Sequence, residues 1–304
     1  MGDAAAPGGR IRAGPAGPGR PGPGGAVSAA DGRERAGWGT YLLLGAFTVV
    51  SVFPLLWTAV AASRTSGRLA QSPPPFRFGR NLGRNLSVAW TEGGMGEALA
   101  NTALVAGSVA LGTVVLSTLA GFAFARLRFR FRGALLLLVG ATLLVPPQLG
   151  VVPLYLVIAR LGWTDQLQAV VLPSLVSAFG VLYLRQHLVE ALPPELLEAA
   201  RMDGAGTARV LWHLVLPAAR PAMAVLGTLS FVAAWNDFFW PVLALTQTGN
   251  PTVQVALTGL GRGYVPDTSV VMAGALLGTL PLLVVLAVFG RQIVGGVMRG
   301  AVKG

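Results

Sequence analysis

The stretch LPPELLEAARMDGAGTARVLWHLVLPAARP, residues 192–221, is a polar insert between two long apolar segments of the chain. Pro193 and Pro194 suit the first turn of a helix because their missing N–H groups would be unpaired there. Glu195 and Glu198 follow where the positive end of the helix dipole favours carboxylates. Since membrane spans flank it, the sequence predicts that this insert is a helical docking element.

A second short helix is predicted after a glycine bend. Gly204 and Gly206 interrupt the first helix, and Thr207 can cap the next one. Pro217 is expected to end this second helix, because proline cannot continue a helical hydrogen-bond ladder. The apolar face of the second helix consists of Val210, Leu211, Leu214 and Val215. We therefore expect a helix-turn-helix over residues 192–221 with its bend at Gly204.

The composition is that of an integral membrane protein. Of 304 residues, 53% are hydrophobic and 12% charged, and the mean hydropathy is +0.64, which is too apolar for a soluble domain of this length. The net charge of +11 comes from basic residues dispersed around apolar segments, so no nucleic-acid partner is expected. Cysteine is absent, which excludes disulfides and thiolate metal sites.

Six apolar runs of membrane-spanning length predict an all-α fold with six transmembrane helices. The expected spans are about 41–61, 100–125, 134–158, 167–184, 222–245 and 268–290. Residues 1–36 are rich in Gly, Ala, Pro and Arg, and we expect them to form a disordered cytoplasmic tail preceding a transmembrane domain of residues 37–304.

The distribution of positive residues predicts the orientation. With both termini inside, sixteen Lys and Arg residues lie on the cytoplasmic side and seven outside, and cytoplasmic loops carry the excess in membrane proteins. Five arginines in the first outer loop oppose this bias. The count nevertheless places the 192–221 loop and both termini in the cytoplasm.

Asp237 is the acidic residue that lies well inside an apolar run. Such residues usually face a bundle interior or an aqueous cavity, so Asn236 and Asp237 are candidates for a translocation path or for a contact with a partner subunit. A helix end at the membrane interface, among the aromatic residues around it, is an equally good interpretation. Gly274 and Gly278 form a GxxxG pattern that favours close helix packing.

The polar insert resembles the cytoplasmic coupling loop of binding-protein-dependent ABC import permeases. The family pattern is Glu-Ala-Ala, three residues, Gly, and about ten residues later an apolar residue followed by Pro. The matching residues here are Glu198, Ala199, Ala200, Asp203, Gly204, Leu216 and Pro217. The resemblance extends over most of the chain from the first span onward and is strongest to the carbohydrate-uptake branch, the maltose and glycerol-phosphate importer permeases.

This resemblance implies a permease of the bacterial cytoplasmic membrane that imports a sugar or oligosaccharide. Its implied partners are two ATP-binding subunits, a second homologous permease and an extracytoplasmic solute-binding protein. Glu198 would contact a basic residue of the ATPase, Ala199 and Ala200 would permit close packing, and Gly204 would set the bend. The chain would perform no covalent chemistry and hold no cofactor. Its single lysine, Lys303, excludes a Walker A motif, so ATP would be bound by the partner.

Three alternatives stay open from the sequence. The permease could serve an importer for another small solute, including an amino acid or a peptide. An ion-coupled secondary transporter would need ionisable residues within its spans, for which Asp237 alone is available. A membrane scaffold or channel would not need the Glu-Ala-Ala loop.

Overall fold

The computed structural model describes residues 37–73, 76–246, 249–261 and 267–301, and within these ranges all regular structure is helical. The predicted tail, residues 1–36, lies outside the described residues. Contacts divide the chain into two units, residues 1–49 and 50–304. Helix α1 (Trp38–Ala62) begins in the first unit, and the other helices lie in the second.

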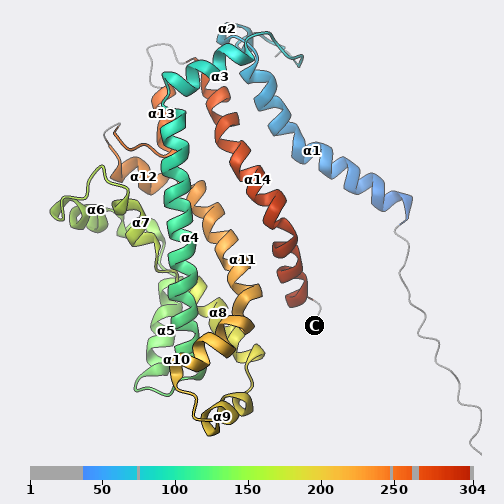
Figure 1. The fold of residues 1–304 in the computed structure, drawn as a ribbon. Coiled ribbons are helices and arrows are strands. Elements are labelled where there is room, and N and C mark those ends of the chain that lie inside the picture. The colour runs from blue at the N-terminus through green and yellow to red at the C-terminus, as the bar shows by residue number, and fades with distance from the viewer. Residues whose placement is uncertain (1–36, 74–75, 247–248, 262–266, 302–304) are drawn as a thin grey trace, which may run out of the picture. The chain divides into compact units, whose positions relative to one another are not determined.

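The second unit is built around three long helices, α4 (Met95–Arg126), α8 (Ala178–Ala191) and α11 (Leu216–Trp235). Glycines let them approach closely. A Cβ atom on Gly180 of α8 would collide with Ser117 Oγ of α4, and one on Gly121 of α4 would lie 2.9 Å from the backbone nitrogen of Arg185. The helix α14 (Thr268–Ala301) packs against α11, and Figure 1 shows these helices running along one another.

The short helices gather at the two ends of this bundle (Figure 1). One end carries α2 (Ser66–Leu69), α3 (Leu82–Thr91), α12 (Phe239–Ala244) and α13 (Val253–Leu260). The opposite end carries α9 (Pro194–Met202), α10 (Thr207–Val210) and the arginine-rich connection from α4 to α5 (Arg132–Thr142). The docking element therefore lies at the same end as the Arg126–Arg132 cluster.

Polar side chains fasten the first of these ends. The buried Asn85 of α3 donates from Nδ2 to the carbonyls of Ala62 and Arg64, at 2.8 and 2.7 Å. Thr102 of α4 accepts the N–H of Val253 on Oγ1 at 2.8 Å, which anchors the start of α13. Chain segments that are distant in sequence are thus tied together outside the long helices.

Among the residues that the structure describes, five helical segments are long and apolar enough to cross a membrane, or six if one bent pair is counted as a single span. The five are Trp38–Ala62, Met95–Arg126, Gln168–Ala191, Thr207–Trp235 and Thr268–Val288. The prediction of an all-α membrane protein is therefore confirmed, and its six predicted spans correspond to these five helices and the bent pair.

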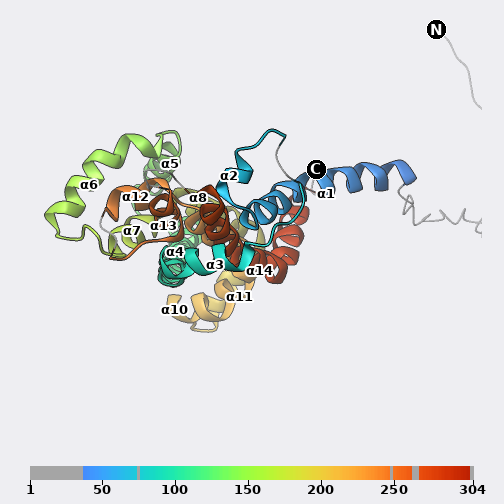
Figure 2. The same ribbon diagram turned by 90° about the horizontal axis from the view of Figure 1, so that it is seen from above.

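The third predicted span, residues 134–158, is wrong as a single helix. It consists of α5, a 3-10 turn at Pro147–Gly150 and α6 (Val151–Arg160), with a bend of 96° between the two arms. Pro146 adopts φ −58° and ψ 127°, because the residue before a proline is driven out of the α region. Figure 2 shows α6 lying on the outer side of α7 and α12.

The fourth span is longer than predicted and is interrupted. It starts as α7 (Gln168–Ser174), breaks at residues 175–177 and continues as α8 to Ala191 instead of ending at residue 184. Ser177 caps the restart by accepting the N–H of Gly180 on Oγ at 3.0 Å. At the far end, an Arg126 guanidinium nitrogen donates to the carbonyl of Val189 at 2.6 Å, which supports the last turn.

The fifth predicted span, residues 222–245, is wrong at its C-terminal side. Helix α11 ends at Trp235, where the Asn236 amide donates to the Val232 carbonyl at 2.8 Å, and α12 starts again at Phe239. Pro241 cannot supply the N–H that would continue the ladder across this break. The indole N–H groups of Trp235 and Trp240, on the two sides of this break, bind the carbonyls of Gly278 and Ala169.

The GxxxG pair does pack closely, but against a short helix. A Cβ on Gly278 would lie 2.6 Å from Val253 Cγ1, and one on Gly274 would lie 2.9 Å from Leu257. Both neighbours belong to α13. The pattern therefore seats α13 on α14.

Candidate functional site

The docking element begins as its sequence predicts. Helix α9 starts at Pro194, after Pro193 in an extended conformation with φ −56° and ψ 145°, and Glu195 lies in its first turn. Proline fits this position because its fixed φ is already helical. The carboxylate of Glu195 lies at the positive end of the helix dipole.

The bend after α9 is a glycine cap of the Schellman type. Gly204 has φ +74°, in the left-handed region that favours glycine. The N–H of Ala205 donates to the Ala200 carbonyl at 2.9 Å, and the N–H of Gly204 donates to the Arg201 carbonyl at 3.0 Å. These two bonds are the pair that defines this cap. The predicted bend at Gly204 is confirmed, and Asp203 is its C-cap residue.

The inner face of the docking element packs against the ends of α4 and α8. Leu197 of α9 and Val210 of α10 are buried in one cluster with Phe122 of α4 and with Leu188 and Leu192 at the end of α8. Ala200 and Ala205, on the two sides of the bend, pack against the same cluster. Burial of such side chains stabilises the contact by about 1.5–3 kcal/mol each, so the element is fastened to the bundle.

The outer face presents the residues of the predicted motif. Glu198, Ala199, Asp203 and Gly204 are all exposed. Met202 is 88% exposed and Leu196 44% exposed beside them. Exposed apolar side chains beside carboxylates are typical of a surface that a partner protein covers. The motif is thus divided: Ala200 packs inward, while its neighbours face outward.

The second half of the element differs from the prediction. Thr207 does not cap the second helix, since Gly206 occupies the cap position and Thr207 is already helical. Pro217 does not end the helix either. Residues Leu211–Val215 form a π-helical turn that leads directly into α11. A π turn shifts the hydrogen-bond register and so accommodates a proline that would clash in a regular helix.

One helical run therefore connects the docking element with the middle of the molecule. It extends over 29 residues from Thr207 to Trp235, which makes it about 43 Å long at 1.5 Å per residue. Within this run, Leu216 at the start of α11 is partly buried, and Pro217 is exposed. His187 of α8 contacts this run through a 3.0 Å hydrogen bond between Nε2 and the Ala218 carbonyl.

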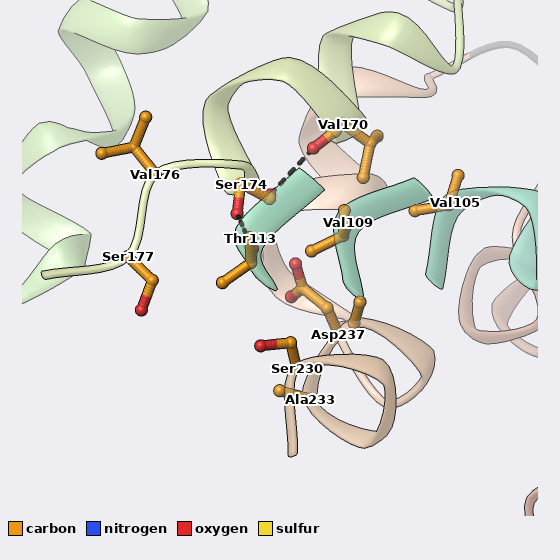
Figure 3. Close-up of a pocket in the computed structure, with 11 residues that line it drawn as sticks. Val105, Val109, Thr113, Val170, Ser174, Val176, Ser177, Ser230, Ala233 and Asp237 are labelled. Atoms are coloured by element: carbon orange, nitrogen blue, oxygen red, sulfur yellow. Dashed lines mark hydrogen bonds between the residues drawn. The ribbon is translucent and has the colours of Figure 1, made fainter. Parts of the chain in front are cut away.

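A cavity of about 390 Å³ lies at the other end of this run. Its wall comes from α4, α7, the break before α8, and the end of α11 (Figure 3). The polar residues on it are Thr113, Ser174, Ser177, Ser230 and Asp237. Both interrupted spans, the fourth and the fifth, thus break at the same cavity. Irregular backbone at membrane depth is tolerated where it lines such a space.

Two of these polar side chains, Thr113 and Ser174, donate hydrogen bonds to backbone carbonyls of the wall, while the Asp237 carboxylate lies in the cavity. Thr113 donates from Oγ1 to the Ser174 carbonyl at 3.4 Å, and Ser174 donates from Oγ to the Val170 carbonyl at 2.8 Å. In Figure 3 the carboxylate of Asp237 points between Thr113 and Ser230. The structure therefore brings Asp237 to the cavity. Asn236 is exposed, is not one of the lining residues and bonds back to Val232.

Sequence reasoning missed the hydroxyl groups of this cavity. Thr113, the pair Ser174 and Ser177, and Ser230 lie in three different spans, and nothing in the sequence shows that they converge. Pro173 next to Ser174 was the available signal, since a proline within a span frees backbone groups that a cavity can accommodate. The two histidines each bond to a backbone carbonyl, His187 to Ala218 and His213 to Arg209. Over the described ranges no cluster of His, Cys, Asp or Glu could hold a metal ion.

Comparison with known proteins agrees with this arrangement. The family described as "Binding-protein-dependent transport system inner membrane component" matches residues 94–298. The lactose transport system permease protein LacG of Rhizobium radiobacter is 28% identical over 86% of this chain and 95% of its own length. The sn-glycerol-3-phosphate transport system permease protein UgpE of Rhizobium meliloti is 31% identical over 85% of this chain and 95% of its own length.

A solved structure has the same fold. It is the crystal structure of a bacterial ABC transporter involved in the import of the acidic polysaccharide alginate. One of its chains superposes with a TM-score of 0.71 and 20% identity, over 83% of this chain and 94% of that chain.

Proposed function

The chain belongs to the family of binding-protein-dependent transport system inner membrane components, and from this premise we propose that it is a permease for a sugar or an oligosaccharide. It is a transport component of an ABC importer without an ATPase site of its own. The support for a carbohydrate is that LacG is named for lactose and that the solved structure belongs to a polysaccharide importer.

We further propose that two ATP-binding subunits, a second homologous permease and an extracytoplasmic solute-binding protein complete the transporter. It would lie in the bacterial cytoplasmic membrane with both termini inside. This orientation is supported by the arginines at 126, 128, 130 and 132, which lie at the same end of the bundle as the docking element (Figure 1). No cofactor would be held by this chain, because the ATPase subunits would bind the ATP.

The docking element is proposed to receive the ATPase. The observation that carries this proposal is its division into two faces: Leu197 fastens it to the bundle, while Glu198, Ala199 and Met202 are exposed. A carboxylate amid apolar surface suits a charge-assisted contact with a basic residue of a partner. The continuous helix from Thr207 to Trp235 would then carry a displacement of the element to the cavity. Transport needs such a link, since ATP can bias two conformations only through contacts that differ between them.

Asp237 is proposed to line the translocation path, because its carboxylate lies in the cavity wall. Asn236 is proposed instead to end α11, through the hydrogen bond from its side-chain amide to the Val232 carbonyl.

Purification of the assembled transporter tests the proposed function. Wild-type chain solubilised in detergent is expected to bring down an ATPase and a second permease. Gly204→Asp should keep the second permease and lose most of the ATPase, because it places a side chain and a second carboxylate beside Asp203 on the exposed face at a backbone position with φ +74°. Gly206→Asp is the matched control, since Gly206 has φ −69°, which any residue adopts. Recovery of the wild-type chain alone would contradict the proposal and favour a secondary carrier or a scaffold.

A further inference from the structure

The described residues that line the cavity at the end of α11 carry charge of one sign only, which is negative. Asp237 is the charged residue on its wall, and no basic side chain is found among the described residues that line it. The remaining polar groups are the hydroxyls of Thr113, Ser174, Ser177 and Ser230. A solute inside would therefore meet one carboxylate and several uncharged hydrogen-bonding groups.

The helix ends around the cavity carry both signs of partial charge. Helices α7 and α11 end there, at Ser174 and Trp235, and the C-terminal end of a helix carries a partial negative charge. Helices α8 and α12 begin beside the same space, at Ala178 and Phe239, and the N-terminal end of a helix carries a partial positive charge. The helix ends therefore largely offset one another, and the carboxylate of Asp237 is the charge that distinguishes this wall.

The size and position of the cavity suit a solute. Its volume of about 390 Å³ falls within the roughly 300–1,000 Å³ that small-molecule pockets occupy. Val105, Val109 and Val170 supply apolar parts of the wall beside the hydroxyls. A small set of hydrogen-bonding groups on an apolar wall fits the hydroxyl groups and the apolar faces of a neutral polyol.

We infer that Asp237 makes this cavity a charge-selective segment of the path, which admits neutral or cationic hydroxyl-rich solutes and disfavours anionic ones. The inference rests on the proposed function, because it assumes that the cavity carries solute. It separates this chain from two proteins it resembles, whose names refer to the anions sn-glycerol-3-phosphate and alginate. The LacG permease is named for lactose, which is a neutral solute of the expected kind.

The absence of cysteine from the chain makes the test direct. Ser230→Cys places a single thiol on the cavity wall near Asp237, and Ser87→Cys on α3 provides an exposed reference thiol outside the cavity. The solubilised transporter is treated with a cationic and with an anionic methanethiosulfonate reagent of similar size, and modification of this chain is followed by mass. Each rate is divided by the rate of the same reagent at Ser87→Cys.

The cavity thiol is expected to favour the cationic reagent by about five- to tenfold after this normalisation. Adding Asp237→Asn should bring the ratio close to one, because the amide keeps the shape and the acceptor oxygen without the charge. An equal rate for both reagents, or a preference that persists in Asp237→Asn, would overturn the inference. So would a Ser230→Cys thiol that does not react while Ser87→Cys does. If Ser230→Cys is not recovered, Ala233→Cys on the same wall takes its place.

The result is separable from the fate of the proposed function. A transporter that copurifies with its ATPase but shows no charge preference would keep the proposed function and remove this inference. A chain recovered alone, with a preference at the cavity that depends on Asp237, would remove the proposed function and, with it, the assignment of this charge preference to an importer's path.

Discussion

The two ends of α11 differ in whether the helix continues. At the docking end the helix continues through Pro217 and Pro221, after a π turn at Leu211–Val215. At the cavity end it stops at Trp235, and Pro241 lies in the short helix that follows. The tertiary contacts differ between the ends: Val215 and Ala219 lie in the buried cluster under α9, while the indoles of Trp235 and Trp240 bind the carbonyls of Gly278 and Ala169. One end adjoins the docking element and the other lies at the cavity.

The largest effect is expected from the cluster that holds the docking end. Leu197→Ala should destabilise the solubilised protein by about 2–4 kcal/mol, because Leu197 is 7% exposed and its removal leaves a cavity. Leu196→Ala, at a neighbouring exposed position, should leave the unfolding midpoint unchanged and weaken the association with the ATPase instead. Thermal unfolding and copurification measure the two effects. Equal midpoints for the two variants would show that the element is not fastened through Leu197.

A substitution at the cavity end of α11 is expected to lower the unfolding free energy by less than Leu197→Ala does, but still measurably. Trp240→Phe removes the hydrogen bond of 2.9 Å from the indole Nε1 to the Ala169 carbonyl and leaves that carbonyl without this partner. We expect a loss of about 1–2 kcal/mol in unfolding free energy. Trp212→Phe is the control, since Trp212 is 68% exposed. If both substitutions had the same effect, the indole bond would not be what stabilises the cavity end.

The bend between α9 and α10 can be tested without adding a charge. Gly204→Ala should cost about 1–2 kcal/mol because an alanine at φ +74° is strained. Gly206→Ala, at φ −69°, should be neutral or slightly stabilising. Hydrogen exchange of the amides in α9 would report the difference as faster exchange in Gly204→Ala alone. The same exchange in both variants would remove the conformational argument for Gly204.

The smallest effect is expected at the opposite end of the bundle, at Asp267 before α14. Partial burial raises the pKa of this carboxyl, but hydrogen bonds from the Ser66 and Ser269 hydroxyls and from the N–H groups of Ser269 and Val270 outweigh it and hold the pKa below its usual range. A lowered pKa in the folded state stabilises the protein above the unfolded value of about 3.9, and this stabilisation is lost as the pH falls through the folded pKa. Stability should therefore decline slightly below about pH 4.

Asp267→Asn isolates this contribution to the pH dependence. The variant should be somewhat less stable at neutral pH and should show a flatter acid limb, because the amide does not titrate in this range. An acid limb identical to that of the wild type would assign the loss of stability to other carboxyls.

Much of the fold could be predicted because its signals are local or long. Apolar runs gave the number of spans, the two prolines placed the start of α9, and Gly204 marked the bend. The motif residues were found because their spacing is contained within one stretch of sequence. Their roles toward a partner stay predictions.

The missed features depend on contacts between distant segments. Pro217 was expected to end a helix because the compensating π turn has no sequence signature. The run from residue 222 to residue 245 was expected to be one helix because apolar composition does not reveal that Trp235 and Trp240 bind different neighbours. The hydroxyls of the cavity come from three spans, so no single stretch could show them together.

The helix from Thr207 to Trp235 is proposed to link the docking element to the cavity. The reactivity of Ser230→Cys, the single thiol of the chain, in the assembled transporter with and without ATP tests this link. We expect that ATP changes this reactivity several-fold and that Gly204→Asp abolishes the change while leaving the rate without ATP as it was. An unchanged rate on adding ATP, or the same change in Gly204→Asp, would contradict it.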